Sequence, residues 1–193
     1  MKELTTLLIL LIIIFIYINF VRKNIYLDLV ESKINNKKYY VRKLSDSQEA
    51  ADKLAILSQD LMNLVNHIQN KDREGISKLI KNFNPDSITE NIPGSMYTAY
   101  SVNKGEEISI CVREKNTEKN TETFIDRNTI NFVAIHELSH VMTNEVGHTP
   151  KFWDNMKFLL EQGIEIGIYT PVDYSSNPVI YCGEEITSTP LHL

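Results

Sequence analysis

The sequence has few of the residues that stabilise small secreted domains or that bind nucleic acid. It contains only two cysteines, Cys111 and Cys182, which are too few for a disulfide framework. Both lie in apolar, strand-like surroundings, which favours buried thiols over metal ligands and leaves one disulfide between them as the alternative. The sequence has no Asn-x-Ser/Thr sequon, and its 20 lysines and arginines are outnumbered by 25 aspartates and glutamates. The net charge of -5 argues against a nucleic-acid-binding face, which depends on clustered basic residues.

An internal repeat and a long linker are also missing from the sequence. A chain of 193 residues with 42% hydrophobic and 23% charged residues has the size and composition of one globular domain. We therefore expect a single domain over residues 24–193, preceded by an N-terminal appendage over residues 1–23.

The appendage holds the one long apolar run, which extends from Leu4 to Val21 without a charge. Its 18 residues would span about 27 Å as a helix, enough for the hydrocarbon core of a bilayer. A cleaved signal peptide is the competing interpretation, but the run is long for one and no small-x-small cleavage site follows it. We therefore expect a single-pass transmembrane helix with the lipid bilayer as its partner. Arg22 and Lys23 follow the run, so the positive-inside rule favours a cytoplasmic domain.

Hydrophobic periodicity predicts the elements of the domain. Outside residues 125–165, these are hairpins over 25–43 and 97–113, helices over 46–68 and 72–82, a polar loop over 114–123 and an extended tail over 169–183. The hairpin 25–43 turns at Asn35-Asn36. Asp46 and Glu49 form a possible capping box at the start of the longer helix.

One short motif contains residue types that bind metals and catalyse reactions, His136-Glu137-Leu138-Ser139-His140. On a helix, His136 and His140 lie on one face, about 40° apart around the axis, so that both imidazoles can bind one small cation. Glu137 lies about 100° from His136 and can reach a water on the metal without being a ligand itself. Two histidine ligands and a carboxylate general base are the pattern of zinc peptidases.

The surroundings of the motif favour a helix and a third ligand. Asp126 or Asn128 can cap a helix that carries an apolar stripe up to Val141. His148 follows His140 after a predicted turn and is the nearest candidate for the third ligand that a catalytic zinc site needs. The alternatives are a chance match to a five-residue pattern and a solvated turn histidine at position 148.

The motif and the segment Gly147-His148-Thr149-Pro150-Lys151-Phe152-Trp153 together resemble the WLM and SprT-like branch of zinc peptidases. In that branch a third histidine follows HExxH, and a helix then opens on an aromatic residue. The resemblance is specific over about residues 125–165 and looser over 95–185, and the chain resembles small membrane-anchored WLM-like proteins of large DNA viruses. It implies an α+β, zincin-like domain in which a small antiparallel sheet packs on the HExxH helix, preceded by the N-terminal transmembrane helix. It also implies Zn2+ held by His136, His140 and His148, with Glu137 as the general base.

We therefore expect a membrane-anchored zinc peptidase with Zn2+ as its cofactor and a protein or peptide as its substrate. Three neutral imidazoles leave the metal one open position for water, and Glu137 takes and returns the proton. One alternative is a membrane-tethered structural or adaptor protein in which zinc only stabilises the fold. Another is a SprT-like protease of nucleoprotein substrates, but the DNA-binding extensions of those relatives are missing and no nucleic acid partner is expected.

Two further expectations concern the substrate. In zincins the strand before the active-site helix commonly borders the cleft, so the resemblance makes residues 107–113 the candidate strand for pairing with an extended substrate. An ordinary interior strand is the alternative there. The tyrosines of the tail are candidate oxyanion donors if the tail crosses the cleft: Tyr169, Tyr174 and Tyr181.

Overall fold

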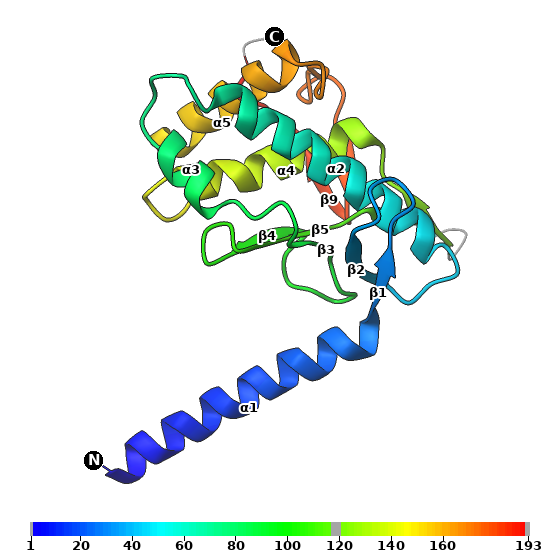
Figure 1. The fold of residues 1–193 in the computed structure, drawn as a ribbon, viewed down its shortest axis with the longest axis vertical. Coiled ribbons are helices and arrows are strands. Elements are labelled where there is room, and N and C mark those ends of the chain that lie inside the picture. The colour runs from blue at the N-terminus through cyan, green and yellow to red at the C-terminus, as the bar shows by residue number, and fades with distance from the viewer. Residues whose placement is uncertain (1, 117–120, 192–193) are drawn as a thin grey trace.

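The structure, a computed structural model, describes residues 2–116 and 121–191 and combines helices with short strands (Figure 1). The helices are α1 (Lys2–Tyr26), α2 (Ser47–Ile68), α3 (Ile76–Asn82), α4 (Arg127–Met142) and α5 (Pro150–Glu165). The strands are β1 (Leu27–Glu31), β2 (Lys38–Arg42), β3 (Ile88–Glu90), β4 (Ala99–Val102), β5 (Glu107–Ile110), β6 (Arg113–Asn116), β7 (Thr121–Phe124), β8 (Val179–Tyr181) and β9 (Glu184–Ile186). The mixed α/β composition agrees with the expected fold class.

The N-terminal run forms the expected helix, α1, which extends away from the other elements in Figure 1. Apolar side chains along it are exposed, among them Leu4, Leu7 and Tyr17. In the part of the chain that the structure describes, no helix meets the length and hydropathy needed to cross a membrane. The predicted membrane span over Leu4 to Val21 is therefore unsupported.

Helix α2 covers the core of the domain because its apolar residues recur at helical spacing. The buried positions include Leu54, Leu57, Leu61 and Leu64, and the helix spans most of the predicted range 46–68. The capping box at its start does not form. Asp46 stands at the N-cap position, but its side chain caps no backbone N–H and instead accepts hydrogen bonds from the Arg113 guanidinium.

The sheet beside α4 has the order β3–β5–β4, with β3 parallel to β5 and β4 antiparallel to it. The sheet is therefore mixed, and the expectation of an antiparallel sheet is wrong because β3 precedes the β4–β5 hairpin in the chain and pairs in parallel with β5. Strand β5 is the central strand and β4 forms an edge. Within the candidate segment 107–113, residues 108–110 are paired on both sides and cannot take up a substrate strand. The strand of this sheet with an open side beside α4 is the edge strand β4.

Two small hairpins flank this sheet. Strands β1 and β2 pair around a turn in which Asn36 has a φ of 57°, and this confirms the predicted hairpin over 25–43. Strands β6 and β7 pair within the run predicted to be a loop, of which residues 117–120 lie outside the described residues. The prediction is wrong for the described flanks because Arg113 is buried in an ion pair with Glu90, a contact distant in sequence.

The chain ends in a third hairpin, β8–β9, which a disulfide between Cys111 and Cys182 ties to the end of β5. The predicted pair of free buried thiols is thus wrong, and the alternative of one disulfide is correct. The hydroxyl of Tyr181 accepts a hydrogen bond from the backbone N–H of Cys111 at 3.0 Å. The Gly183 N–H donates to Glu114 Oε1 at 3.1 Å. The tail therefore lies against the sheet beside α4.

Candidate metal centre

Helix α4 presents the first two histidines. Its start is fixed by Asp126, whose carboxylate accepts hydrogen bonds from the Thr129 N–H at 2.9 Å and from the Thr129 hydroxyl at 2.6 Å. Asn128, the alternative cap, instead exchanges hydrogen bonds with the backbone of Thr170. One turn separates His136 from His140, and their ring centroids lie 4.9 Å apart.

The loop between α4 and α5 brings the third histidine to the first two. The His148 ring centroid lies 4.9 Å from that of His136 and 5.0 Å from that of His140. The Nε2 atoms of His148 and His136 are 3.1 Å apart. One ring nitrogen from each of the three histidines falls within 4.8 Å of the others. The structure thus brings together all three histidines that the sequence predicted as metal ligands.

Lysines from two other elements hold this loop. Lys104, in the β4–β5 turn, donates to the backbone carbonyls of Thr143, Asn144 and Glu145 at 2.9, 2.8 and 3.2 Å. Lys78 of α3 donates to the Thr143 carbonyl at 2.7 Å and to the Asn144 side chain at 3.0 Å. The carbonyls at a helix C-terminus carry partial negative charge, so both ammonium groups stabilise the point at which the chain turns toward His148.

A buried aromatic ring lies against all three imidazoles. The Phe152 ring, fully buried at the start of α5, lies 4.9 Å from His136, 4.3 Å from His140 and 4.8 Å from His148. Burial lowers the pKa of His136 to about 3 and that of His140 to about 4, with a further contribution from the neighbouring histidines. Both imidazoles are therefore neutral near pH 7, the form that binds a metal.

Glu137 lies on α4 beside the histidines and is only 5% exposed. The burial raises the pKa of its carboxyl to about 7, against the hydrogen bonds that it accepts from the side chain and backbone N–H of Ser101. Ser101 belongs to the edge strand β4, so this strand fixes the direction of the carboxyl. A carboxyl with a pKa near 7 exchanges protons readily at neutral pH.

The three histidines fit a zinc ion. Two nitrogens bound tetrahedrally to zinc at about 2.0–2.1 Å lie about 3.3 Å apart, which is close to the 3.1 Å between His136 and His148. Three neutral imidazoles are the ligand set of a catalytic zinc site that keeps a position for water.

Two cavities meet at this centre, one on each side of it along β4. The tail-side cavity, of about 290 Å³, lies between α4, α5 and the segment from Tyr181 to Ser188. The loop-side cavity, of about 500 Å³, lies between β4 and the loop Glu145–His148. Ala99, His136 and Glu137 border both cavities.

The tail does reach the cleft, but its tyrosines differ in position. Tyr181 lines the tail-side cavity, and burial raises the pKa of its hydroxyl. Tyr169 and Tyr174 pack against the Phe132 ring, with centroids 5.9 and 4.7 Å away. Of the three candidate oxyanion donors, only Tyr181 is therefore among the residues that line this cavity.

Sequence reasoning missed Ser101 and Lys104. Both lie in the β4–β5 hairpin, more than thirty residues from the chain that they contact. A serine in a strand and a lysine in a turn are common, so no local pattern distinguishes them. The expectation that the strand before the active-site helix borders the cleft pointed at the right hairpin but at the wrong strand.

Comparisons with known proteins agree with this geometry. The family model described as WLM domain matches residues 33–178. "Uncharacterized protein R325" of Acanthamoeba polyphaga mimivirus is 35% identical over 164 residues, which cover 80% of this chain and 79% of that protein. "Uncharacterized protein 136R" of Invertebrate iridescent virus 6 is 27% identical over 152 residues, covering 75% and 83%. The crystal structure of Wss1 from Saccharomyces cerevisiae is similar in fold, with a TM-score of 0.50 and 18% identity over 66% of this chain and 87% of that one.

Proposed function

The chain belongs to the WLM domain family, and from this premise we propose that it is a zinc-dependent peptidase with Glu137 as its general base. The observation that carries the proposal is the convergence of three imidazoles within 4.8 Å, with a buried carboxyl beside them. The net charge of -5 supports a protein or peptide substrate over a nucleic acid.

His136, His140 and His148 would hold the zinc, and the lowered pKa values of His136 and His140 keep those two rings neutral for binding. The metal, when bound, supplies a Lewis acid that lowers the pKa of a water and polarises the substrate carbonyl. Phe152 covers the histidines from one side and excludes water there.

Glu137 moves the proton. Its carboxylate accepts a proton from the attacking water and delivers it to the leaving amine as the amide bond breaks. The two hydrogen bonds from Ser101 hold the carboxyl in one orientation throughout, which keeps the distance for each transfer short. The pKa of about 7 suits a group that must act first as base and then as acid.

The test compares zinc content and proteolysis of the full chain with those of Glu137→Gln and His148→Ala. We expect one zinc per chain in the wild type and in Glu137→Gln, and weaker zinc binding in His148→Ala. Casein cleavage should fall by several orders of magnitude in Glu137→Gln, because removal of the general base leaves the metal site intact. Zinc content is read by atomic absorption and cleavage by the release of soluble peptides.

Each part of the proposal can fail separately. A folded wild-type protein without zinc would contradict the metal site. A wild-type protein that binds zinc and cleaves no protein or peptide would favour a zinc-stabilised structural protein. Equal cleavage by wild type and Glu137→Gln would remove Glu137 as the general base.

A further inference from the structure

The hairpin β8–β9, called the tail hairpin below, covers residues 179–186 and lies beside the metal centre. Tyr181 and the residues from Glu184 to Ser188 line the tail-side cavity together with His136 and Glu137. The position of this hairpin therefore determines how open the metal centre is on the tail side.

The disulfide is the main attachment of the tail hairpin to the rest of the domain. Among the described strands, β8 and β9 pair only with each other. Within residues 175–188, all of which the structure describes, Tyr181 is the one buried residue. A two-stranded hairpin with so little burial is at best marginally stable by itself. Its position therefore depends on the residues next to Cys182 and on the bond from Cys182 to Cys111.

The turn of the hairpin places a cysteine where other residues are preferred. Cys182 and Gly183 connect the two strands and have φ angles of 53° and 85°. Two consecutive positive φ angles are typical of a type I′ turn, in which Asn-Gly is the favoured pair. A cysteine rarely adopts this left-handed conformation. Because the cross-link offsets that cost, its loss weakens the turn as well as the attachment.

A cavity gives a small reductant access to the disulfide. It has a volume of about 640 Å³ and lies among the loop Asn91–Thr98, the start of β6 and the turn of the tail hairpin, and both cysteines line it. Cys182 is only partly buried, whereas Cys111 is 9% exposed. A dithiol fits a cavity of this size, and the sulfur of Cys182 is the more open to attack.

We propose that the disulfide Cys111–Cys182 is a reducible lock on the tail hairpin, and that its reduction by a dithiol opens the metal centre on the tail side. A thiolate of the dithiol attacks Sγ of Cys182, the bond between the two protein sulfurs breaks, and Cys111 leaves as a thiolate. The second thiol of the reductant then displaces Cys182 and closes a disulfide in the reductant. Two electrons and two protons pass to the protein sulfurs, and the dithiol is oxidised.

Hydrogen–deuterium exchange of the full chain, with and without dithiothreitol, tests the lock. Amides of residues 179–186 should exchange about tenfold faster or more after reduction. Those of α2 should keep their protection, which shows that the domain stays folded. The variant Cys111→Ser/Cys182→Ser should exchange fast in residues 179–186 in both conditions. Mass spectrometry confirms complete reduction of the wild type by the added mass of two hydrogens.

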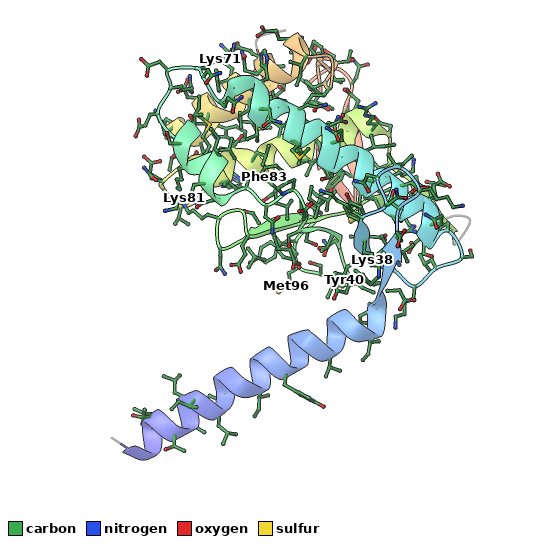
Figure 2. The ribbon with its side chains drawn as sticks, viewed as in Figure 1. Lys38, Tyr40, Lys71, Lys81, Phe83 and Met96 are labelled. Carbon is green, nitrogen blue, oxygen red and sulfur yellow. A yellow bond between two sulfur atoms is a disulfide. The ribbon has the colours of Figure 1, made fainter. Side chains whose placement is uncertain are left out.

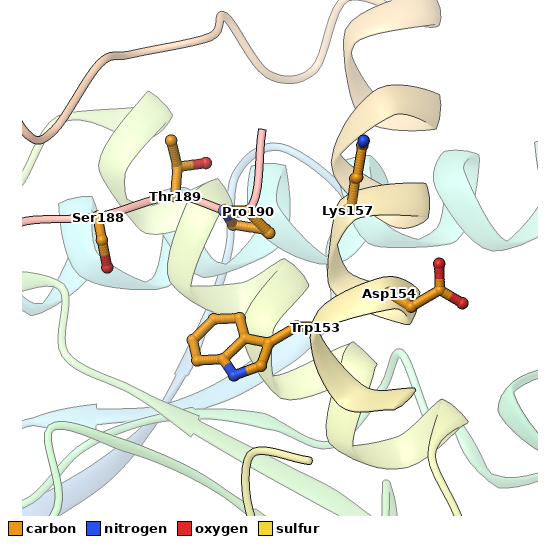
Figure 3. A pocket seen from close by; sticks show the side chains of 6 residues that line it. All are labelled: Trp153, Asp154, Lys157, Ser188, Thr189 and Pro190. Carbon is orange, nitrogen blue, oxygen red and sulfur yellow. The ribbon is translucent and has the colours of Figure 1, made fainter. Parts of the chain in front are cut away.

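Trp153 gives a second measure of the release of the tail. Its indole lies beside the segment Ser188–Pro190 in Figure 3, and both line a cavity of about 410 Å³. Trp153 is the only tryptophan of the sequence, so the fluorescence comes from this position alone. Acrylamide should quench the fluorescence more strongly in the reduced protein than in the oxidised one.

The histidines report on the opening of the metal centre itself. His136 lines the tail-side cavity, whereas His148 lines the loop-side cavity and is already exposed. In metal-free protein, diethylpyrocarbonate should modify His136 several times faster in Cys111→Ser/Cys182→Ser than in oxidised wild type. His148 is the internal control and should react at the same rate in both proteins. Mass spectrometry of the digested protein measures each rate.

The effect on cleavage rests on the proposed peptidase function. Zinc-loaded Cys111→Ser/Cys182→Ser should cleave casein faster than oxidised wild type, because the substrate enters more freely. Unchanged exchange of residues 179–186 after complete reduction, or a simultaneous loss of protection in α2, would overturn the lock. Equal modification of His136, or equal and measurable cleavage, would overturn its effect on the metal centre. Release of the tail with no cleavage by either protein would support the lock and contradict the peptidase.

Discussion

Lys104 acts on His148 only through the loop between them. Its ammonium group holds three consecutive backbone carbonyls at the end of α4, and His148 follows three residues later. A ligand that is carried on a loop binds its metal well only when the loop is held in place, because ordering it otherwise costs conformational entropy. The loop in turn carries Val146, which is 90% exposed at the rim of the loop-side cavity.

We predict that Lys104→Met weakens zinc binding about tenfold while the protein stays folded. The substitution keeps the aliphatic stem and removes the three hydrogen bonds. Zinc affinity is measured by competition with a chelating dye. Lys81→Ala is the control, because Lys81 is exposed on α3 (Figure 2), and it should leave the affinity unchanged. Equal zinc affinities of Lys104→Met and wild type would show that the loop keeps its position without the hydrogen bonds from Lys104.

The carboxyl of Asp46 contributes to the free energy of unfolding of the protein, and this contribution depends on pH. Hydrogen bonds from Arg113 lower the pKa of Asp46 in the folded protein, with burial acting in the opposite direction. The pKa is about 3.9 in an unfolded chain. Because the folded pKa is the lower of the two, the contribution is fully present above the unfolded value and is lost as the pH falls through the folded one.

We therefore predict that Asp46→Asn is less stable than wild type at pH 7 by about 1 kcal/mol, a value reduced for the partial exposure of Asp46. The difference should shrink as the pH falls below about 4, where wild type also loses the charge. Urea unfolding at several pH values measures both. A difference that stays constant down to the lowest pH would contradict the assignment of the effect to this charge.

Among the elements, β3 and β6 are joined by a buried ion pair. The side chains of Glu90 and Arg113 are each 1% exposed and form a hydrogen-bonded ion pair. The second carboxylate oxygen of Glu90 accepts a hydrogen bond from the Arg42 N–H at 2.7 Å, which adds β2 to the connection. A buried charge without its partner is costly, so each of the three strands depends on the other two.

We predict that Glu90→Gln destabilises the protein by about 3 kcal/mol, because the buried guanidinium loses one of its two ion pairs and keeps the one with Asp46, which is partly exposed. The free energy of unfolding is measured in urea at neutral pH. Asp86→Asn is the matched control: Asp86 also pairs with a basic residue, Lys37, but both are largely exposed, and its loss should cost less than about 1 kcal/mol. Equal losses in the two variants would contradict the role of burial.

These elements also show how far the sequence could predict the fold. Helices α2, α4 and α5 and the hairpins β1–β2 and β4–β5 follow from periodicity and turn residues, which are local in the chain. The parallel pairing of β3 with β5 and the strands β6 and β7 were missed. Both depend on contacts such as Glu90 with Arg113, and a polar run such as 114–123 gives no sign of a partner that is distant in sequence.

At the scale of the whole molecule, the sequence predicted the three histidines of the candidate site. It did not predict the residues from other elements that position the site. His136 and His140 follow from helical spacing. His148 was the nearest candidate for a third ligand after the predicted turn, and the resemblance to the WLM domain family, now confirmed, implied it as well. Ser101, Lys104 and the tail reach the site only through tertiary structure. The pairing of Cys111 with Cys182 is of the same kind, because two cysteines in apolar strands give no indication of their distance in space.

We predict that replacing both cysteines by serine lowers the free energy of unfolding by about 2–4 kcal/mol. The disulfide joins residues 71 apart, and a cross-link over a loop of this length restricts the unfolded chain strongly. Urea unfolding measures the loss. Reductant should lower the stability of the wild type to that of the serine variant and should leave the variant itself unchanged. An effect of reductant on the variant would point to a cause other than this bond.

The disulfide also has a topological consequence. Helices α4 and α5, with all three histidines, lie between Cys111 and Cys182 and thus inside one covalent ring. A single cut of the backbone anywhere in that ring opens it without releasing a fragment. Nicked protein would therefore stay in one piece in a denaturing gel without reductant and separate into two pieces only after reduction, so a backbone cut within the ring stays undetected until the sample is reduced.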